Sequence, residues 1–223
     1  MIANPQVTEQ LTAAGRAIEQ GSFAIIDAEV GSHDYTPEQW PLVRRMIHAN
    51  ADFEFNGLTV FHRQAMAAGL AAVLAGATPI VADVEMICSG LSVPRLRHFG
   101  LHPRHYISDP DVIERAQAEG TTRAVQAMRK AQREGQLDGA IVGIGNAPTA
   151  LIEVVRLIRE EGVRPALVIG MPVGFVSAAE AKDLLMTVDE VPWIAIRGRK
   201  GGSTLVVAAI HALLSFAESR RAA

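Results

Sequence analysis

Ala140-Ile141-Val142-Gly143-Ile144 is a short apolar run, and the loop Gly145-Asn146-Ala147 separates it from a helical pattern at 148–160. The same succession of apolar run, glycine-containing loop and helix occurs twice more: 166–169 before 178–186, and 193–196 before 203–216. Short all-apolar strands between amphipathic helices are typical of a parallel sheet that helices cover on both faces. This segment therefore predicts an α/β fold.

The residues before this segment add elements of both kinds. Helical patterns are found at 10–29, 36–50, 64–74, 110–119 and 122–134, and strand patterns at 59–61, 79–82 and 106–108. No repeat or linker divides the chain, so we predict a single domain over residues 1–223. We expect a three-layer α/β/α architecture with a mainly parallel, Rossmann-like sheet. Ligands of such folds bind beyond the carboxyl ends of the strands, where the glycine-containing loops should meet.

Composition and charge narrow the class of protein. Hydrophobic residues make up 49% of the 223 residues and the net charge is −3, so we expect no nucleic-acid partner and no binding to anionic membranes. No apolar stretch approaches the roughly 18 residues that span a bilayer, and residues 1–10 contain no secretory apolar segment. The single cysteine, Cys88, allows no internal disulfide and indicates a reducing, cytoplasmic location.

Two of the loops are candidate anion sites. The run 143–148, Gly-Ile-Gly-Asn-Ala-Pro, is similar to a dinucleotide fingerprint, but Pro148 replaces the third glycine and the expected acidic residue is missing. The run 197–204 carries three cations around a glycine pair, without the Gly-Lys-Ser/Thr of a Walker loop. Backbone N–H groups at a helix start favour an anion, so each loop is either a ligand loop or an ordinary turn.

A second basic stretch, residues 95–105, contains three arginines and three histidines. The histidines could ligate a metal, but no carboxylate is close in sequence, and we predict no metal site. Recognition of carboxylates by the arginines is a better interpretation of this stretch, and plain surface a better one still.

His48 lies near the C-terminal end of the helix predicted at 36–50. Arg44 and Asp52, a cation and an anion, are each one helical turn away, and the end of the helix favours a charged ring. A histidine in this place could transfer protons near neutral pH, although a structural or surface histidine would give the same local pattern. Cys88 has no activating neighbour in the sequence.

Seven segments of the chain, in order, resemble the precorrin-8X methylmutase family, also called cobalt-precorrin-8 methylmutases: 22–26, 45–54, 83–86, 121–123, 145–150, 170–176 and 197–203. The similarity extends from about Ala17 to Leu213. Residues 94–105 match the family poorly, so no site residue is transferred from them. The sequence Asp52-Phe53-Glu54 is more similar to the branch of the family that acts in the cobalt-early route, but three residues do not decide between the branches.

The resemblance implies an isomerase of vitamin B12 synthesis that moves a methyl group from C11 to C12 of a ring-contracted tetrapyrrole. The product would be hydrogenobyrinate, or cobyrinate when cobalt is present. His48 matches the proton-transferring histidine and Ser22 a substrate-contacting position, while Arg123 and Asn146 lie in matching motifs and are assigned substrate contact on that basis. The family needs no redox cofactor, nucleotide or metal, and it forms homodimers.

The carboxylates of such a macrocycle would suit N–H groups at helix starts and locally placed arginines. Met86, Met171 and Phe175 could line an apolar cleft for the ring, or they could be ordinary core. Two alternatives stay open: an NAD(P)-linked oxidoreductase on a doubly wound sheet, and a non-catalytic corrinoid-binding protein.

Overall fold

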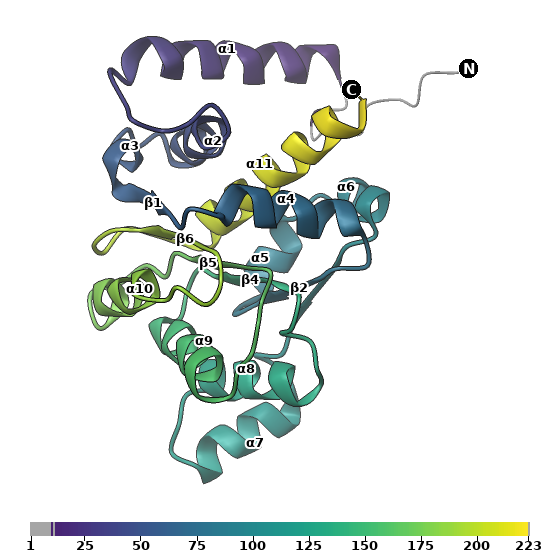
Figure 1. Cartoon of the computed structure of the whole chain (residues 1–223), viewed down its shortest axis with the longest axis vertical. Helices are drawn as coiled ribbons and strands as arrows, with labels where there is room; N and C mark the ends of the chain where they lie inside the picture. Colours follow the sequence, from purple (N-terminus) through teal and green to yellow (C-terminus); the bar gives the residue numbers. More distant parts are fainter. Residues whose placement is uncertain (1–9, 11, 223) are drawn as a thin grey trace.

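The computed structural model describes residues 10 and 12–222, and its centre is a six-stranded sheet (Figure 1). The strands lie in the order β1-β6-β5-β4-β2-β3, and all neighbours pair in parallel except β1 with β6. Their bounds are β1 (Thr59–Phe61), β2 (Pro79–Ala82), β3 (His102–His105), β4 (Ile141–Ile144), β5 (Leu167–Gly170) and β6 (Trp193–Ile196). The prediction of a mainly parallel sheet is confirmed.

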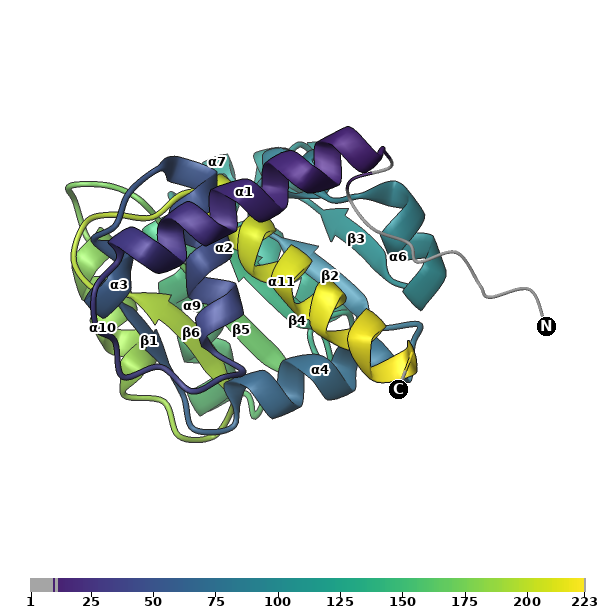
Figure 2. The same ribbon diagram turned by 90° about the horizontal axis from the view of Figure 1, so that it is seen from above.

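Helices cover both faces of the sheet, which confirms the three layers. One layer contains α4 (Ala65–Ala75), α5 (Glu85–Gly90), α6 (Val93–Phe99) and α11 (Ser203–Ala222). The other contains α7 (Pro110–Ala118), α8 (Arg123–Arg133), α9 (Pro148–Glu160) and α10 (Ala178–Met186). Beyond α11 lies α2 (Trp40–Asn50), followed by the short α3 (Phe55–Leu58), and α1 (Ala13–Glu29) lies across α2 (Figure 2).

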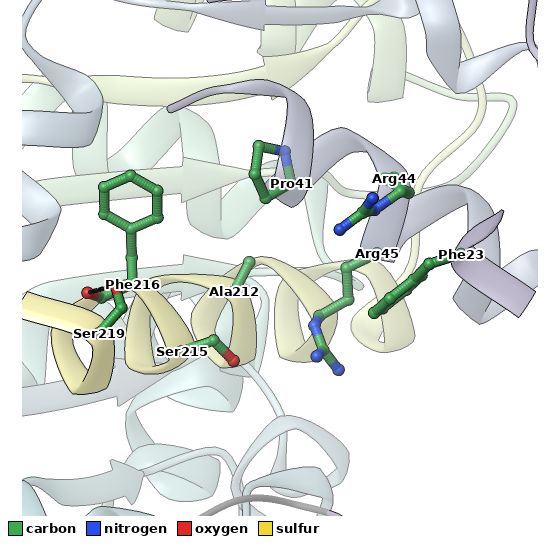
Figure 3. A pocket seen from close by; sticks show the side chains of 8 residues that line it. All are labelled: Phe23, Pro41, Arg44, Arg45, Ala212, Ser215, Phe216 and Ser219. Carbon is green, nitrogen blue, oxygen red and sulfur yellow. Dashed lines mark hydrogen bonds between the residues drawn. The ribbon is translucent and has the colours of Figure 1, made fainter. Parts of the chain in front are cut away.

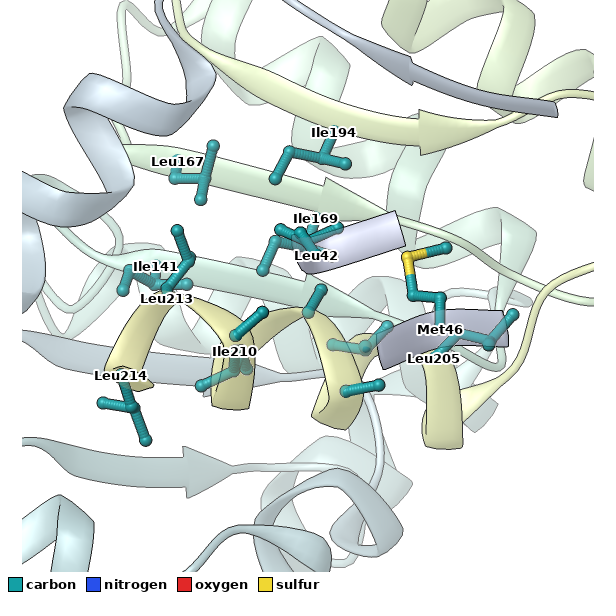
Figure 4. Close-up of a cluster of buried hydrophobic side chains, with 14 of the residues drawn as sticks. Leu42, Met46, Ile141, Leu167, Ile169, Ile194, Leu205, Ile210, Leu213 and Leu214 are labelled. Carbon is teal, nitrogen blue, oxygen red and sulfur yellow. The ribbon is translucent and has the colours of Figure 1, made fainter. Parts of the chain in front are cut away.

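Helix α11 is the centre of the larger core. Figure 4 shows side chains of α11 in one buried cluster with strand residues such as Ile169 and with Leu42 and Met46 of α2. Leu205, Ile210 and Leu213 of α11 are fully buried. A helix that is apolar on all sides is stable only when every side is covered, and here the sheet covers one side and α2 another. Burying each such leucine or isoleucine contributes roughly 1.5–3 kcal/mol.

Two local predictions need correction. The predicted strand at 106–108 is wrong, because β3 ends at His105 and the next residues form a turn in which Asp109 N–H donates to the Tyr106 carbonyl over 3.1 Å. Pairing with β2 fixes the strand at 102–105, and its polar residues give an edge strand no apolar signal. The helix predicted from residue 36 begins at Trp40. The reciprocal bonds expected of a capping box do form between Thr36 and Gln39, but in the turn before the helix.

No helix within residues 10 and 12–222 has the length and apolar character needed to cross a membrane.

A buried ion pair joins α6 to α11. Arg95 is only 1% exposed; its Nε donates to Glu218 Oε1 over 3.0 Å, and its Nη2 donates to Ser215 Oγ over 2.8 Å. Arg95 therefore belongs to the core. It is not available to recognise a ligand carboxylate, which was one interpretation of the basic stretch 95–105. The other arginines and histidines of the stretch lie on α6 and on the edge strand β3.

Substitution of Glu218→Leu leaves the Arg95 guanidinium buried without this carboxylate. We expect the free energy of unfolding to fall by about 3–5 kcal/mol, as is typical when one partner of a buried pair is removed. Denaturant unfolding measures the change. The double variant Arg95→Met/Glu218→Leu should recover most of the loss, because neither charge of the pair is then left buried without its partner. A loss below about 1 kcal/mol in the single variant would contradict a stabilising role for Glu218.

Candidate functional site

The loops after β4, β5 and β6 meet at one edge of the sheet, as predicted. Met171 N–H donates to the Ile144 carbonyl and Gly202 N–H donates to the Met171 carbonyl, both over 2.8 Å. The backbones touch so closely that a side chain would not fit: a Cβ on Gly145 would lie 2.7 Å from Ser203 Cα, and one on Gly201 would clash with the Met171 carbonyl. These glycines are needed for backbone contact between loops.

Asp83 directly follows β2, and its side chain binds the backbone of the loop that resembled a dinucleotide fingerprint. Its side chain is fully buried, and it accepts three backbone hydrogen bonds: from Gly145 at 3.0 Å, Asn146 at 2.8 Å and Ala147 at 2.7 Å. Burial raises the pKa of the Asp83 carboxyl, while the three N–H groups act in the opposite direction by stabilising the carboxylate. The expectation that these N–H groups are open to a ligand anion is therefore wrong, and a dinucleotide phosphate has no place there.

Two lysines hold the loop at 197–202. The Lys200 ammonium pairs with Asp52, and also with Glu54 Oε2 at 3.0 Å, so the loop is tied to the segment that follows α2. Lys182 of α10 is fully buried and donates from Nζ to the Lys200 carbonyl over 2.6 Å. Of the three cations counted in this loop, Lys200 thus has an internal partner.

His48 and Ser22 line the same hollow on the outer surface of α1 and α2. The hollow has a volume of about 340 Å³ and is lined by Ser22, Ile25, Ile26, Glu29, Ile47, His48, Ala51 and Phe53. The His48 side chain is exposed, and its ring meets that of Phe23 edge-on at 5.4 Å between centroids. The Ser22 hydroxyl donates to the Ile18 carbonyl over 2.9 Å. The structure therefore brings two of the predicted site residues together beside an apolar surface.

The charged neighbours expected for His48 are engaged elsewhere. Arg44 Nη1 donates to Asp27 Oδ2 over 2.6 Å, and its guanidinium lies 4.5 Å from the centre of the Phe23 ring (Figure 3). Asp52 has left the helix, because Ala51 adopts a left-handed conformation with φ of 51°. The hydrogen bond from Lys200 lowers the pKa of the Asp52 carboxyl. The sequence spacing placed Arg44 and Asp52 on one helical face with His48; Arg44 keeps that place in α2, whereas the turn at Ala51 removes Asp52 from it.

Arg123 and Asn146 are exposed at the carboxyl edge of the sheet. Arg123 begins α8 and Asn146 precedes α9, and the two helix starts are joined by a 2.9 Å hydrogen bond between the hydroxyls of Thr122 and Thr149. The hollow of His48 and Ser22 is linked to this edge through α11. Thr204 Oγ1 of α11 donates to Asn50 Oδ1 at the end of α2 over 3.2 Å.

Exposed apolar residues surround the same loops. Met86 is 65% exposed and Phe175 is 84% exposed, whereas Met171 is fully buried. Of the three residues considered for an apolar cleft, Met171 is therefore core. Val176, at 82% exposed, adds to the surface, and the Arg199 guanidinium lies 5.6 Å from the centre of the Phe175 ring.

Sequence reasoning missed the roles of three residues: Asp83, Lys182 and Phe23. The signal for Asp83 was present, since an acidic residue directly after a parallel strand lies at the ligand edge of the sheet. Cys88 is unsuited to nucleophilic chemistry, because burial raises the pKa of its thiol to about 11. Among residues 10 and 12–222, no group of three His, Cys, Asp or Glu side chains is placed to hold a metal ion.

Comparisons with known proteins agree with the resemblance seen in the sequence. A family model described as precorrin-8X methylmutase matches residues 17–216. The cobalt-precorrin-8 methylmutase of Leptospira interrogans is 48% identical over 95% of this chain and 98% of its own, and that of Priestia megaterium is 49% identical over 94% and 91%. A solved structure of precorrin-8x methyl mutase from Thermus thermophilus is 53% identical, with a TM-score of 0.85 over 92% of this chain and 99% of that one.

The buried Lys182 makes the stability depend on pH. Burial lowers the pKa of its ammonium to about 8, from an ordinary value of 10.5. Below pH 8 the folded and unfolded chains both carry the proton, so the cost of burying the charge is fully present. Between pH 8 and 10.5 the unfolded chain keeps the proton that the folded chain has lost, so this residue makes stability rise with pH.

Comparison with Lys182→Met isolates this contribution, because methionine has nearly the same length and no charge. We expect the unfolding free energy of the wild type, relative to the variant, to increase by up to about 3 kcal/mol from pH 7 to pH 10.5. Urea unfolding of both proteins at several pH values measures it. If the unfolding free energies of the two proteins change with pH in parallel across this range, Lys182 does not titrate there.

Proposed function

The chain belongs to the precorrin-8X methylmutase family, and from this premise we propose that it catalyses the family's methyl shift, an isomerisation in cobalamin biosynthesis. The substrate is precorrin-8X or cobalt-precorrin-8, and the methyl group moves from C11 to C12 to give hydrogenobyrinate or cobyrinate. The observation that carries the proposal is the family match over most of the chain, together with the hollow that His48 and Ser22 share.

His48 is the proposed catalytic residue. Its imidazole donates a proton to a ring position of the macrocycle, which favours the tautomer in which the methyl group can migrate. Because substrate and product are isomers, the macrocycle returns one proton to the imidazole after the shift, and no other reactant is needed. The exposed ring at the end of α2 supports this role, since a substrate can reach it.

Ser22, Arg123 and Asn146 are the proposed substrate contacts. A guanidinium and an amide can each donate hydrogen bonds to the acetate and propionate carboxylates of the macrocycle, and the Ser22 hydroxyl can do so by turning away from the Ile18 carbonyl. Ser22 lies beside His48 in the hollow, while Arg123 and Asn146 lie at helix starts on the sheet edge. The flat ring needs an apolar surface as well, and the exposed side chains of Met86 and Phe175 are suited to it.

We further propose that residues 1–223 form one domain that works as a homodimer in the cytoplasm. The single sheet takes strands from residue 59 to residue 196, and the free Cys88 thiol suits a reducing compartment. The α1 helix supports the dimer, because among its described residues only Ile26 is buried, while Ile18 is 71% and Ile25 is 58% exposed. A second copy of the chain would cover this apolar stripe.

The variant Ile18→Glu/Ile25→Glu tests the dimer. Charges on the stripe would have to be desolvated at the interface, so we expect the dimer dissociation constant to rise at least about 100-fold. Light scattering after size-exclusion chromatography measures the mass. Ile152→Glu, an exposed isoleucine on α9, is the control and should remain a dimer. A wild-type protein that is monomeric at micromolar concentration rules out the homodimer.

The variant His48→Ala tests the catalytic role. We expect conversion of precorrin-8X, followed by absorption spectroscopy, to fall below detection, while corrinoid binding and thermal unfolding stay close to wild type. His102→Ala, which removes an exposed histidine from the edge strand β3, should convert substrate normally. Parallel assays with cobalt-precorrin-8 assign the metal content of the substrate. Binding without conversion in the wild type would identify a carrier, and normal conversion by His48→Ala would remove the role given to His48.

A further inference from the structure

The Asp83 side chain accepts all three of its hydrogen bonds from one loop. Its two carboxylate oxygens receive the N–H groups of three consecutive residues, 145–147, and its own N–H donates to the Gly143 carbonyl over 3.1 Å. Three converging donors at the start of α9 form the kind of site that holds a ligand anion in other α/β folds. Here the anion comes from the chain itself and is fully buried.

The loop that Asp83 holds is packed against the rest of the site. Gly145 lies against the backbone of Ser203, where a Cβ would meet Ser203 N at 2.8 Å and Cα at 2.7 Å. The next residue, Thr204, donates to Asn50 Oδ1, two residues after His48. A shift of the loop would therefore displace the exposed Asn146 first, and the end of α2 only through two further contacts.

We propose that Asp83 is a positioning residue for substrate binding: its carboxylate fixes loop 145–147 so that the Asn146 side chain meets the macrocycle in one orientation. This rests on the proposed function, because Asn146 is taken as a substrate contact. Asp83 itself touches neither the substrate nor the catalytic imidazole. Its removal should weaken substrate binding more than it slows the methyl shift.

The variant Asp83→Asn keeps the shape of the side chain but turns one acceptor into an NH₂ group that faces N–H donors. We expect the KM for precorrin-8X to rise at least about 10-fold while kcat falls less than about 3-fold. Hydrogen exchange of the amides at 145–147 should accelerate at least about 10-fold. Asn146→Ala should raise KM similarly, and the double variant should add little to either single change.

The chain offers a matched control at the opposite edge of the sheet. Asp138 precedes β4, and its Oδ1 accepts the Arg164 N–H over 2.6 Å. Asp138→Asn makes the same chemical change to another loop-holding carboxylate, and its KM should stay within about 2-fold of wild type. For Asp83→Ala, formate should restore part of the lost binding by supplying a carboxylate to the vacated space, and chloride at the same concentration should not.

A KM of Asp83→Asn within 2-fold of wild type overturns the proposal, as does slow amide exchange at 145–147 that the substitution leaves unchanged. If the variants fail to fold, the wild type still decides: amides at 145–147 that exchange as fast as those of the exposed Phe175 loop show that Asp83 does not hold them. These outcomes differ from failure of the proposed function, which is absence of conversion by the wild type or normal conversion by His48→Ala.

Discussion

Burial of α11 between the sheet and α2 is the contact on which the site depends. Most of the helix between Leu205 and Ala217 is buried, so it is stable only with the strands on one side and Leu42 and Met46 of α2 on another. This packing attaches α2, a helix outside the three layers, to the edge where the strand-to-helix loops end. His48 is thereby placed near the start of α11, although more than 150 residues separate them in sequence.

Charges inside the molecule hold the loops at that edge. Asp83 fills a ring of backbone donors, Lys182 meets a carbonyl, and Lys200 joins the loop after β6 to the segment after α2. Each group has a partner of the complementary kind, which offsets part of the cost of desolvation. The consequence is a site whose loops are held without a bound anion, so the proposed contacts to substrate carboxylates fall to exposed side chains such as Arg123.

Much of the fold could be predicted because its signals are local. The apolar runs at 79–82 and 193–196 coincide with β2 and β6, and the helices at 148–160 and 178–186 have the predicted bounds. The edge strand β3 was missed because its polar residues are held by pairing with β2, and the short α5 and α6 have too few residues to show periodicity. For the candidate site, the sequence predicted which residues take part but not how they are arranged in space. The partners of Asp83 lie 62 to 64 positions away, and the turn at Ala51 separates Asp52 from the helical face of His48.

The glycine contacts between the loops also limit how this scaffold can diversify. Positions 145 and 201 cannot accept a side chain, so substitutions there cannot be used to change ligand preference. Phe175 and Val176 are mostly exposed and Val173 is about half exposed, so replacing them should change the free energy of unfolding little. In the described part of the chain, the frame and the variable surface are thus separate sets of residues. A directed-evolution library aimed at unnatural macrocycles can be confined to the second set.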